Sequence, residues 1–330
     1  MNIYDIAKLS GVSYGTVSRV INNKEGVKKE TREKVKGILE EYDYLPNSFA
    51  RGLAKKGMKI IGIILIDVRN IHHINIAFDI EKEFSKLGYT CIIGSCGHDN
   101  TKQEGYLRVM AGRNVDGLVL IGSGFQNDIT KSSIEKYFSN KPVVMTNGYL
   151  NLENVCGIVL NERKAVTDVV GYLVGRGHRN IAFVNDYITY SAEEKQKGFM
   201  EGIKNNNILF NEKNIIHIKT DLDISEVETQ KLLLFNKNIT AIIYSEDIMA
   251  VGGIKACNNL NLNVPKDINI VGFNNSIYSD ISTPKISSID NRIHEMCEKC
   301  TKTLYSMLMK AEVHPILKIT PKFVVKQSTN

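Results

Sequence analysis

From residue 60 to residue 273, short runs of β-branched and other apolar residues alternate with amphipathic stretches of helical spacing. The first run covers residues 60–66, and a helical pattern follows over about residues 75–87. This alternation is typical of parallel sheets whose strands are joined by helices. Further strands are predicted over residues 89–94, 115–121, 142–145, 181–184, 215–218, 240–244 and 268–273. So many strands indicate two lobes of doubly wound α/β architecture, with a ligand crevice where the carboxyl ends of the two sheets face each other.

The chain of 330 residues is long enough for a small module beside these two lobes. Hydrophobic residues make up 43% and charged residues 24%, and no apolar run has the length that spans a bilayer. The first residues contain no basic segment followed by an apolar one, so we expect a cytoplasmic protein without a membrane partner. The pair Cys297 and Cys300 lies in a predicted helix over about residues 292–310, which favours plain packing over a metal or redox role.

Positive charge gathers at the N-terminal end. Residues 1–59 contain twelve Lys and Arg against seven Asp and Glu, a balance of +5 within a total of +6. Such a distribution is the electrostatic footprint of a partner that is a polyanion. A solvated basic tail would show the same charge, so the folding pattern of this segment has to decide between the two.

The N-terminal segment is patterned as three short helices around one small core. Ser13 offers an N-cap to the second helix, and Thr31 is the predicted N-cap of the third, which stops before Pro46. The expected core residues are Ile6, Ala7, Leu9, Val17, Val20, Ile21, Val35, Ile38, Leu39 and Tyr42.

The second helix then carries its polar residues on the outside. The residues expected on this outer face are Tyr14, Gly15, Thr16, Ser18 and Arg19. An arginine can bond bidentately to guanine, whereas Thr and Ser hydroxyls suit phosphates, so Arg19 is the best candidate for reading a base. On these residues alone, a surface helix with ordinary polar side chains is the alternative.

Taken as one string, the segment resembles the DNA-binding domain of the lac repressor family. The order and spacing match over residues 4–7, 11–22, 31–35 and 44–47. The resemblance implies a helix-turn-helix domain over residues 1–46 whose recognition helix begins at Tyr14. Tyr14 and Gly15 then distinguish one operator from another, Arg19 makes the shared base contact, and Asn22 contacts a phosphate or a base edge.

Residues 47–54 resemble the hinge helix of the same family, which folds only when two copies meet on the operator. Leu53 matches the wedge residue that enters the minor groove and bends the DNA, and the small Ala50 permits close packing. Asn47, Ala50 and Leu53 are therefore expected to contact DNA within a hinge over residues 47–58. An ordinary linker helix is the alternative.

The resemblance continues over residues 114–118, 175–182, 247–252 and 271–273, and the core of this family looks like a periplasmic sugar-binding protein. It implies an effector-binding and dimerisation core over residues 59–330. The N-lobe is expected at about residues 59–159 plus 290–319, and the C-lobe at about residues 160–289 plus 320–330. Two chains would pair through these cores as a homodimer on a near-palindromic operator.

Strand ends that face the crevice supply the candidate effector contacts. By position these are Asp67, Asn70, His72, His73, Ser123, Asn147, Lys195, Glu246 and Asn274. The loop over residues 67–73 holds more polar groups than a connector needs; its two histidines could stack on a sugar or bond an anion, and adjacent histidines without a third ligand are poor chelators, so no metal site is expected. The segment 122–124 lacks the rest of either nucleotide-binding fingerprint and is interpreted as a crevice loop.

Three of these positions depart from the residues that are frequent in the family. Lys195 stands where an arginine is common, Glu246 where an asparagine is common, and Asn274 where an acidic residue is common. An amide holds sugar hydroxyls with weaker, neutral hydrogen bonds than a carboxylate does. The ligand could then be a sugar, a phosphorylated sugar, a nucleobase or a protein corepressor, or the site could have no ligand.

Together these features predict a sequence-specific DNA-binding transcription regulator, a repressor under the control of a small-molecule effector. An enzyme is not expected, because the chain has no nucleophile elbow, no Walker loop and no helix with paired metal-binding histidines, and no cofactor is expected either. A transport-type binding protein and an architectural DNA binder are the remaining alternatives. Either sign of control by the ligand is compatible with the sequence.

Overall fold

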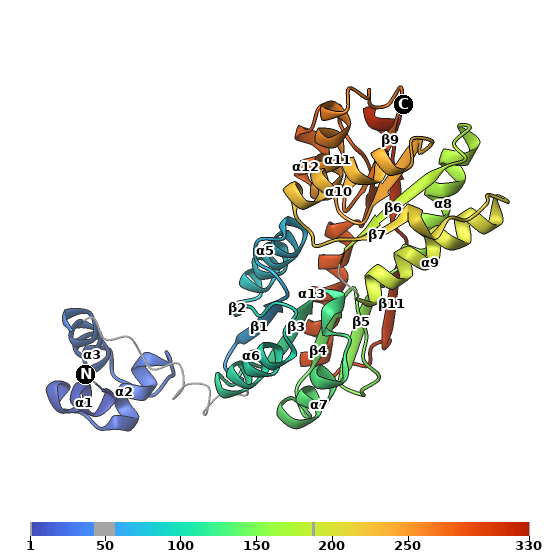
Figure 1. Ribbon diagram of the computed structural model, residues 1–330. Helices are drawn as coiled ribbons and strands as arrows, with labels where there is room; N and C mark the ends of the chain where they lie inside the picture. Colours follow the sequence, from blue (N-terminus) through green and yellow to red (C-terminus); the bar gives the residue numbers. More distant parts are fainter. Residues whose placement is uncertain (1, 43–56, 187–188, 330) are drawn as a thin grey trace. The chain divides into compact units, whose positions relative to one another are not determined.

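The computed structural model describes residues 2–42, 57–186 and 189–329. The chain divides into two compact units, Met1–Met58 and Lys59–Asn330, each with a hydrophobic core of its own (Figure 1). Among the described residues, none of the helices combines the length and the apolar character that a membrane crossing needs. The predicted hinge residues Asn47, Ala50 and Leu53 lie outside the described residues.

The first unit contains three helices, α1 (Ile3–Ser10), α2 (Tyr14–Ile21) and α3 (Lys29–Glu41). Asn2 caps α1 in a capping box with Asp5, and the left-handed Gly11 ends this helix, because glycine adopts a positive φ without strain. The fully or almost fully buried core consists of Ile6, Val17, Val20 and Val35. Three-helix packing and the Ser13 cap of α2 are as predicted.

Three details of this unit were predicted wrongly. Helix α3 begins at Lys29, so Thr31 lies inside its first turn and is not the N-cap. Lys28 occupies the capping position without a side-chain hydrogen bond, which shows that packing of Val35 fixes this helix rather than its cap. Leu9 is 46% exposed and does not belong to the core, because α1 is too short to bury more than one apolar stripe. Tyr42 is 45% exposed and also lies outside the core, because it follows the last residue of α3.

The second unit is built on two six-stranded sheets (Figure 1). The sheet of the N-lobe has the order β11-β5-β4-β3-β1-β2, and all its pairs are parallel. The sheet of the C-lobe has the order β12-β10-β9-β8-β6-β7, in which only the β10–β12 pair is antiparallel. Both sheets are doubly wound, as predicted.

The N-lobe strands are β1 (Ile60–Leu65), β2 (Thr90–Ser95), β3 (Gly117–Ile121), β4 (Val143–Thr146), β5 (Val155–Leu160) and β11 (Ile316–Ile319). The C-lobe strands are β6 (Ile181–Asn185), β7 (Ile215–His217), β8 (Ala241–Tyr244), β9 (Asn269–Phe273), β10 (Ser287–Asp290) and β12 (Lys322–Val324).

Helices cover the faces of each sheet. The N-lobe carries α5 (Ile71–Lys86), α6 (Asn100–Gly112), α7 (Asp128–Tyr137), α13 (Ile293–Leu308) and the short η1 (Ser123–Phe125). The C-lobe carries α8 (Glu162–Gly175), α9 (Tyr190–Asn205), α10 (Leu222–Phe235), α11 (Asp247–Asn259), α12 (Ile277–Ile281), η2 (Glu212–Asn214) and η3 (Gln327–Thr329). The chain crosses between the lobes after β5, after β10 and after β11, so the crevice lies beside these crossings.

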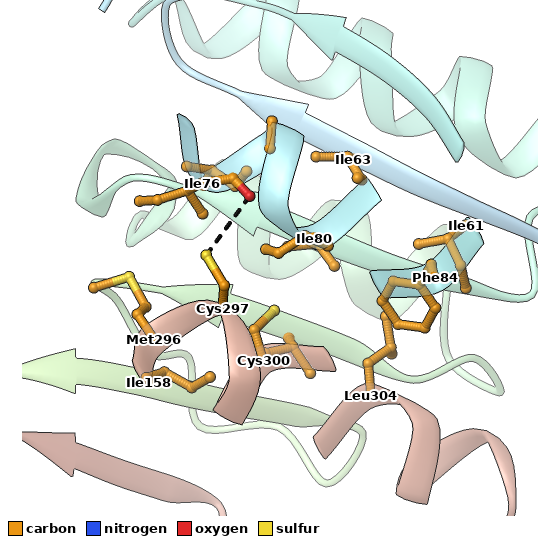
Figure 2. Packing of buried hydrophobic residues seen from close by; sticks show 14 of the residues in the cluster. Ile61, Ile63, Ile76, Ile80, Phe84, Ile158, Met296, Cys297, Cys300 and Leu304 are labelled. Atoms are coloured by element: carbon orange, nitrogen blue, oxygen red, sulfur yellow. Dashed lines mark hydrogen bonds between the residues drawn. The ribbon is translucent and has the colours of Figure 1, made fainter. Parts of the chain in front are cut away.

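Figure 2 shows the core of the N-lobe between α5 and α13. Ile76, Ile80 and Phe84 of α5 are fully buried against this core. Cys297 donates its thiol to the carbonyl of Ile76 over 3.8 Å, and Cys300 is buried beside it. All six cysteines are free, and burial raises the pKa of the Cys297 thiol to about 12. The packing role predicted for this pair is confirmed.

Candidate functional sites: the polar face of helix α2 and the interlobe crevice

The outer face of α2 presents the predicted DNA-reading residues. Val17 and Val20 are buried, so the opposite side of the helix meets solvent. Ser13 positions this face because its hydroxyl accepts a hydrogen bond from the backbone N–H of the first turn. On or beside this side, Tyr14, Gly15 and Arg19 are exposed, and Thr16, Ser18 and Asn22 are half-buried.

Tyr4 and Asn22 affect which groups the outer face of α2 presents to a partner. Tyr4 of α1 stacks on Tyr14, with ring centroids 5.2 Å apart, and both rings are exposed. Tyr4 was not predicted from sequence, because only the packing of α1 on α2 brings it there. Asn22 ends α2, and its amide donates to the carbonyl of Ser18 over 2.8 Å, so this amide is partly occupied within the unit.

The second unit contains a cavity of about 360 Å³ between its two lobes. This volume lies in the range of pockets that take small molecules. All nine residues predicted as effector contacts line it. They are Asp67, Asn70, His72, His73, Ser123, Asn147, Lys195, Glu246 and Asn274.

The histidines of the N-lobe wall lie in the first turn of α5, whereas the sequence analysis placed them on a loop. The helix begins earlier than predicted because the Asn70 side chain accepts hydrogen bonds from the backbone N–H groups of His72 and His73, over 2.9 and 3.2 Å. Burial lowers the pKa of His72 to about 3 and that of His73 to about 4, so both rings are neutral at pH 7. At the rim, Arg69 pairs with Asp67 over 2.7 Å and lowers the pKa of that carboxyl.

Lys195 is the buried cation of the C-lobe wall, with a side chain that is 6% exposed. Its ammonium donates to the carbonyl of Ser245 over 3.1 Å and lies 4.0 Å from the centroid of the Phe273 ring. It also lies 3.8 Å from the carboxylate of Glu162. The charge of Lys195 is therefore balanced by groups of the protein itself.

Glu162 is a lining residue that the sequence analysis missed. Its Oε1 accepts hydrogen bonds from the hydroxyl of Ser191 over 2.7 Å and from the amide of Asn147 over 3.2 Å. Asn147 follows β4 of the N-lobe and Ser191 lies on α9 of the C-lobe, so this carboxyl joins the lobes. Burial raises its pKa, and Lys195 only partly offsets this effect. An acidic residue in the first turn of a helix is common, so its position alone does not indicate a site residue.

At the inner end of the crevice, the amide of Asn274 donates to Glu246 over 2.6 Å, and the amide of Asn291 donates to Asn274 over 2.6 Å. Burial raises the pKa of Glu246 to about 8; Lys195 lowers it, while Asp186 and Asp247 raise it further. Ser123 is buried in η1, within the predicted crevice loop. Within the part of the chain that the structure describes, no group of three His, Cys, Asp or Glu side chains could hold a metal ion.

An exposed polar helix on a small basic unit and a polar crevice in a larger one define a DNA-binding protein with a ligand-binding core. Known families match both parts. Residues 2–47 match the bacterial regulatory proteins of the lacI family, and residues 170–329 match the periplasmic binding protein-like domain. An HTH-type transcriptional regulator of Lachnoclostridium phytofermentans is 30% identical over 332 residues, covering 100% of both chains. The chain belongs to the lacI family and is a DNA-binding transcriptional regulator.

Other relatives agree. Catabolite control protein A of Priestia megaterium is 29% identical and covers 100% of this chain and 99% of its own. A structure of the lac repressor dimer bound to operator and the anti-inducer ONPF superposes with a TM-score of 0.86 at 22% identity, covering 100% and 99% of the chains. A complex of the transcriptional regulator CelR with cellobiose gives a TM-score of 0.74 at 20% identity, with 99% of each chain covered. The relatives are named as regulators and not as enzymes.

Proposed function

We propose that this chain is a repressor that binds a near-palindromic operator as a homodimer, in the cytoplasm where bacterial DNA lies, and that a small molecule in the interlobe crevice sets its affinity for DNA. The observation that carries the proposal is that nine polar residues, predicted from separate strand ends, line one cavity of about 360 Å³. Residues 1–46 would form the DNA-binding domain, residues 47–58 the hinge and residues 59–330 the core.

The DNA contacts follow from the exposed face of α2. Arg19 reads a base by a bidentate bond, and Tyr14 and Gly15 distinguish operators at the start of the recognition helix. Thr16, Ser18 and Asn22 bind phosphates or base edges, with Asn22 contributing through the part of its amide that its cap of α2 leaves unused. Asn47, Ala50 and Leu53 enter the minor groove as the hinge.

The controlling partner is a small molecule rather than a protein corepressor. A cavity of about 360 Å³ lined by polar side chains suits a molecule the size of a sugar or nucleoside, whereas a protein binds to a surface. A ligand that contacts both lobes changes their balance of free energy, and coupling of this kind is typically about 1–3 kcal/mol.

Pairing of two cores is supported by large apolar side chains that the single chain leaves in solvent. Phe78 on α5 is 62% exposed and Ile281 on α12 is 67% exposed, one on each lobe. A second copy would bury both, and the superposed lac repressor structure is itself named as a dimer. Phe78→Ser with Ile281→Ser is expected to shift the sedimentation coefficient from that of a dimer toward that of a monomer.

The test is selection of genomic fragments with the purified full-length protein at physiological salt, followed by titration of the selected site with metabolite pools. A near-palindromic site whose affinity changes with a pool supports the proposal. Recovery of no preferred sequence would replace it with architectural DNA binding. A preferred site that ignores every pool would leave a repressor without a small-molecule effector.

A further inference from the structure

The crevice contains buried polar atoms that have no hydrogen-bond partner. They include Oε2 of Glu162, Oδ1 of Asn147, Oδ1 of Asn291 and the Nδ1 atoms of His72 and His73. Buried polar atoms in proteins are almost always paired, so a concentration of unpaired ones in a cavity indicates bonds that a ligand completes. Three of these atoms, the carboxylate oxygen and the two amide oxygens, can only accept.

Three amide donors at the same place are engaged within the protein. The carboxyl of Glu162 accepts a hydrogen bond from the amide nitrogen of Asn147, and that of Glu246 accepts one from the amide nitrogen of Asn274. The remaining amide oxygen of Asn274 then takes the amide of Asn291. This chain of bonds fixes the orientation of all three amides and leaves the oxygens of Asn147 and Asn291 free to accept from a ligand.

The charges of the residues that line the crevice also favour a positively charged ligand. Lys195 is engaged by the Ser245 carbonyl, the Phe273 ring and Glu162. His72 and His73 are neutral at pH 7. The acidic lining residues are Asp67, Glu162, Asp186, Asp221, Asp223 and Glu246, and the basic ones are Arg69, Lys195 and Lys219.

We infer that the effector carries a protonated amine, in a molecule of sugar or nucleoside size, and that this amine binds among the acceptors of Glu246, Asn291 and Glu162. A primary ammonium supplies three donors and one positive charge at a single point, which suits the unpaired oxygens of Glu162 and Asn291 and the excess of carboxyl groups. A phosphorylated sugar would instead place its negative charge beside the unpaired acceptor oxygens of Glu162, Asn147 and Asn291. The inference rests on the proposed function, since it names the chemical class of the effector in that same site.

The raised pKa of Glu246 supports this assignment. The nearby Lys195 does not offset the effect of burial on this carboxyl, so its ionised form lacks sufficient compensation in the empty crevice. An ammonium beside Glu246 would stabilise the ionised form and displace its proton.

The test fractionates an active metabolite pool by charge. The pool from cells that express the protein is passed over a strong cation exchanger and over an anion exchanger at pH 7, and each fraction is titrated against the full-length protein on its selected operator by fluorescence anisotropy. We expect the change in operator affinity in the material that the cation exchanger retains. Activity in the unretained material or in the anion-exchanger eluate would overturn the inference while the proposed function stands. An unfractionated pool without effect would instead refute the proposed function, and the inference with it.

A matched pair of variants ties the result to the crevice. Glu246→Gln removes the carboxyl of the site, whereas Glu298→Gln removes an exposed carboxyl on α13 that pairs with Lys302. The concentration of the retained fraction that gives half the effect is expected to rise at least about tenfold in Glu246→Gln and to stay unchanged in Glu298→Gln. Thermal unfolding of both variants checks that they are folded. Equal responses of the two folded variants would contradict the assignment of the amine to Glu246.

Discussion

Replacement of Gly198 by alanine tests how closely α8 and α9 approach each other. A Cβ atom at this position would lie 2.2 Å from the carbonyl oxygen of Arg163 and 2.9 Å from its carbonyl carbon. Because both are backbone atoms, α8 as a whole has to move by about 1 Å before the contact becomes ordinary. Such overpacking costs up to about 3 kcal/mol, while alanine returns about 1 kcal/mol of helix propensity. We expect Gly198→Ala to lower the free energy of unfolding of the core by about 2 kcal/mol.

Gly171→Ala provides the matched control in the same helix pair. Gly171 lies within α8, and a Cβ there meets no atom within 4 Å, so only the helix propensity changes. Differential scanning calorimetry of the full-length proteins should show the core transition about 4–8 °C lower in Gly198→Ala and about 2–4 °C higher in Gly171→Ala. A Gly198→Ala protein as stable as the wild type would refute the steric reasoning. A loss of stability in Gly171→Ala would refute the assumption that helix propensity decides that position.

Three further outcomes are expected. Arg19→Ala should abolish the preference for operator over scrambled DNA and keep salt-sensitive binding, as measured by anisotropy at two salt concentrations; preserved selectivity would contradict its role. Lys195→Met leaves the carboxyl of Glu162 buried without its cation, so urea unfolding at pH 7 should show a loss of about 3 kcal/mol, and an unchanged midpoint would contradict this. In the unfolded chain Glu246 loses its proton near pH 4.5, but in the folded chain only near pH 8, so its contribution to stability falls across this window. Glu246→Gln removes that fall, so the free energy of unfolding of the variant relative to the wild type should rise by about 2 kcal/mol from pH 5 to pH 8. This value is below the full linkage value because the side chain is half-buried. Parallel pH profiles of the two proteins would contradict an origin in the titration of Glu246.

Strands with continuous apolar residues, such as β1 and β3, were predicted from sequence. Strand β5 was missed although it is also mostly apolar. The other strands that were missed have different reasons to be buried. Strand β10 contains Ser287 and Ser288, which are fully buried because their hydroxyls bond to Thr329 and Asp247. Thr329 is 42 residues from Ser287 and Asp247 is 41 residues from Ser288, so no local pattern predicts these partners. Strands β11 and β12 are short, and each forms an edge of a different sheet. Their places follow from the passage of the chain from one lobe to the other between them.

The crevice residues that follow the carboxyl ends of predicted strands could be predicted from sequence. The carboxyl ends of parallel strands meet at one edge, so Asn147, Glu246 and Asn274 could be placed there without knowledge of their neighbours. Glu162 was not predictable, because it follows β5, a strand that was missed, and its partners come from two lobes. The start of α5 was predicted too late because the cap by Asn70 is a local hydrogen bond that outweighs the weak helical preference of the residues after it.

The bond between Asn147 and Glu162 indicates how a ligand could act on the whole unit. Asn147 belongs to the N-lobe and Glu162 to the C-lobe, and each has one oxygen without a partner in the crevice. A ligand that donates to both oxygens can form both hydrogen bonds only while Asn147 and Glu162 stay close together. It therefore stabilises this arrangement of the two lobes over others. Each buried acceptor that gains a partner contributes about 1–3 kcal/mol. Two such bonds therefore suffice for the coupling of about 1–3 kcal/mol that is typical of allosteric control, without any contribution from the rim.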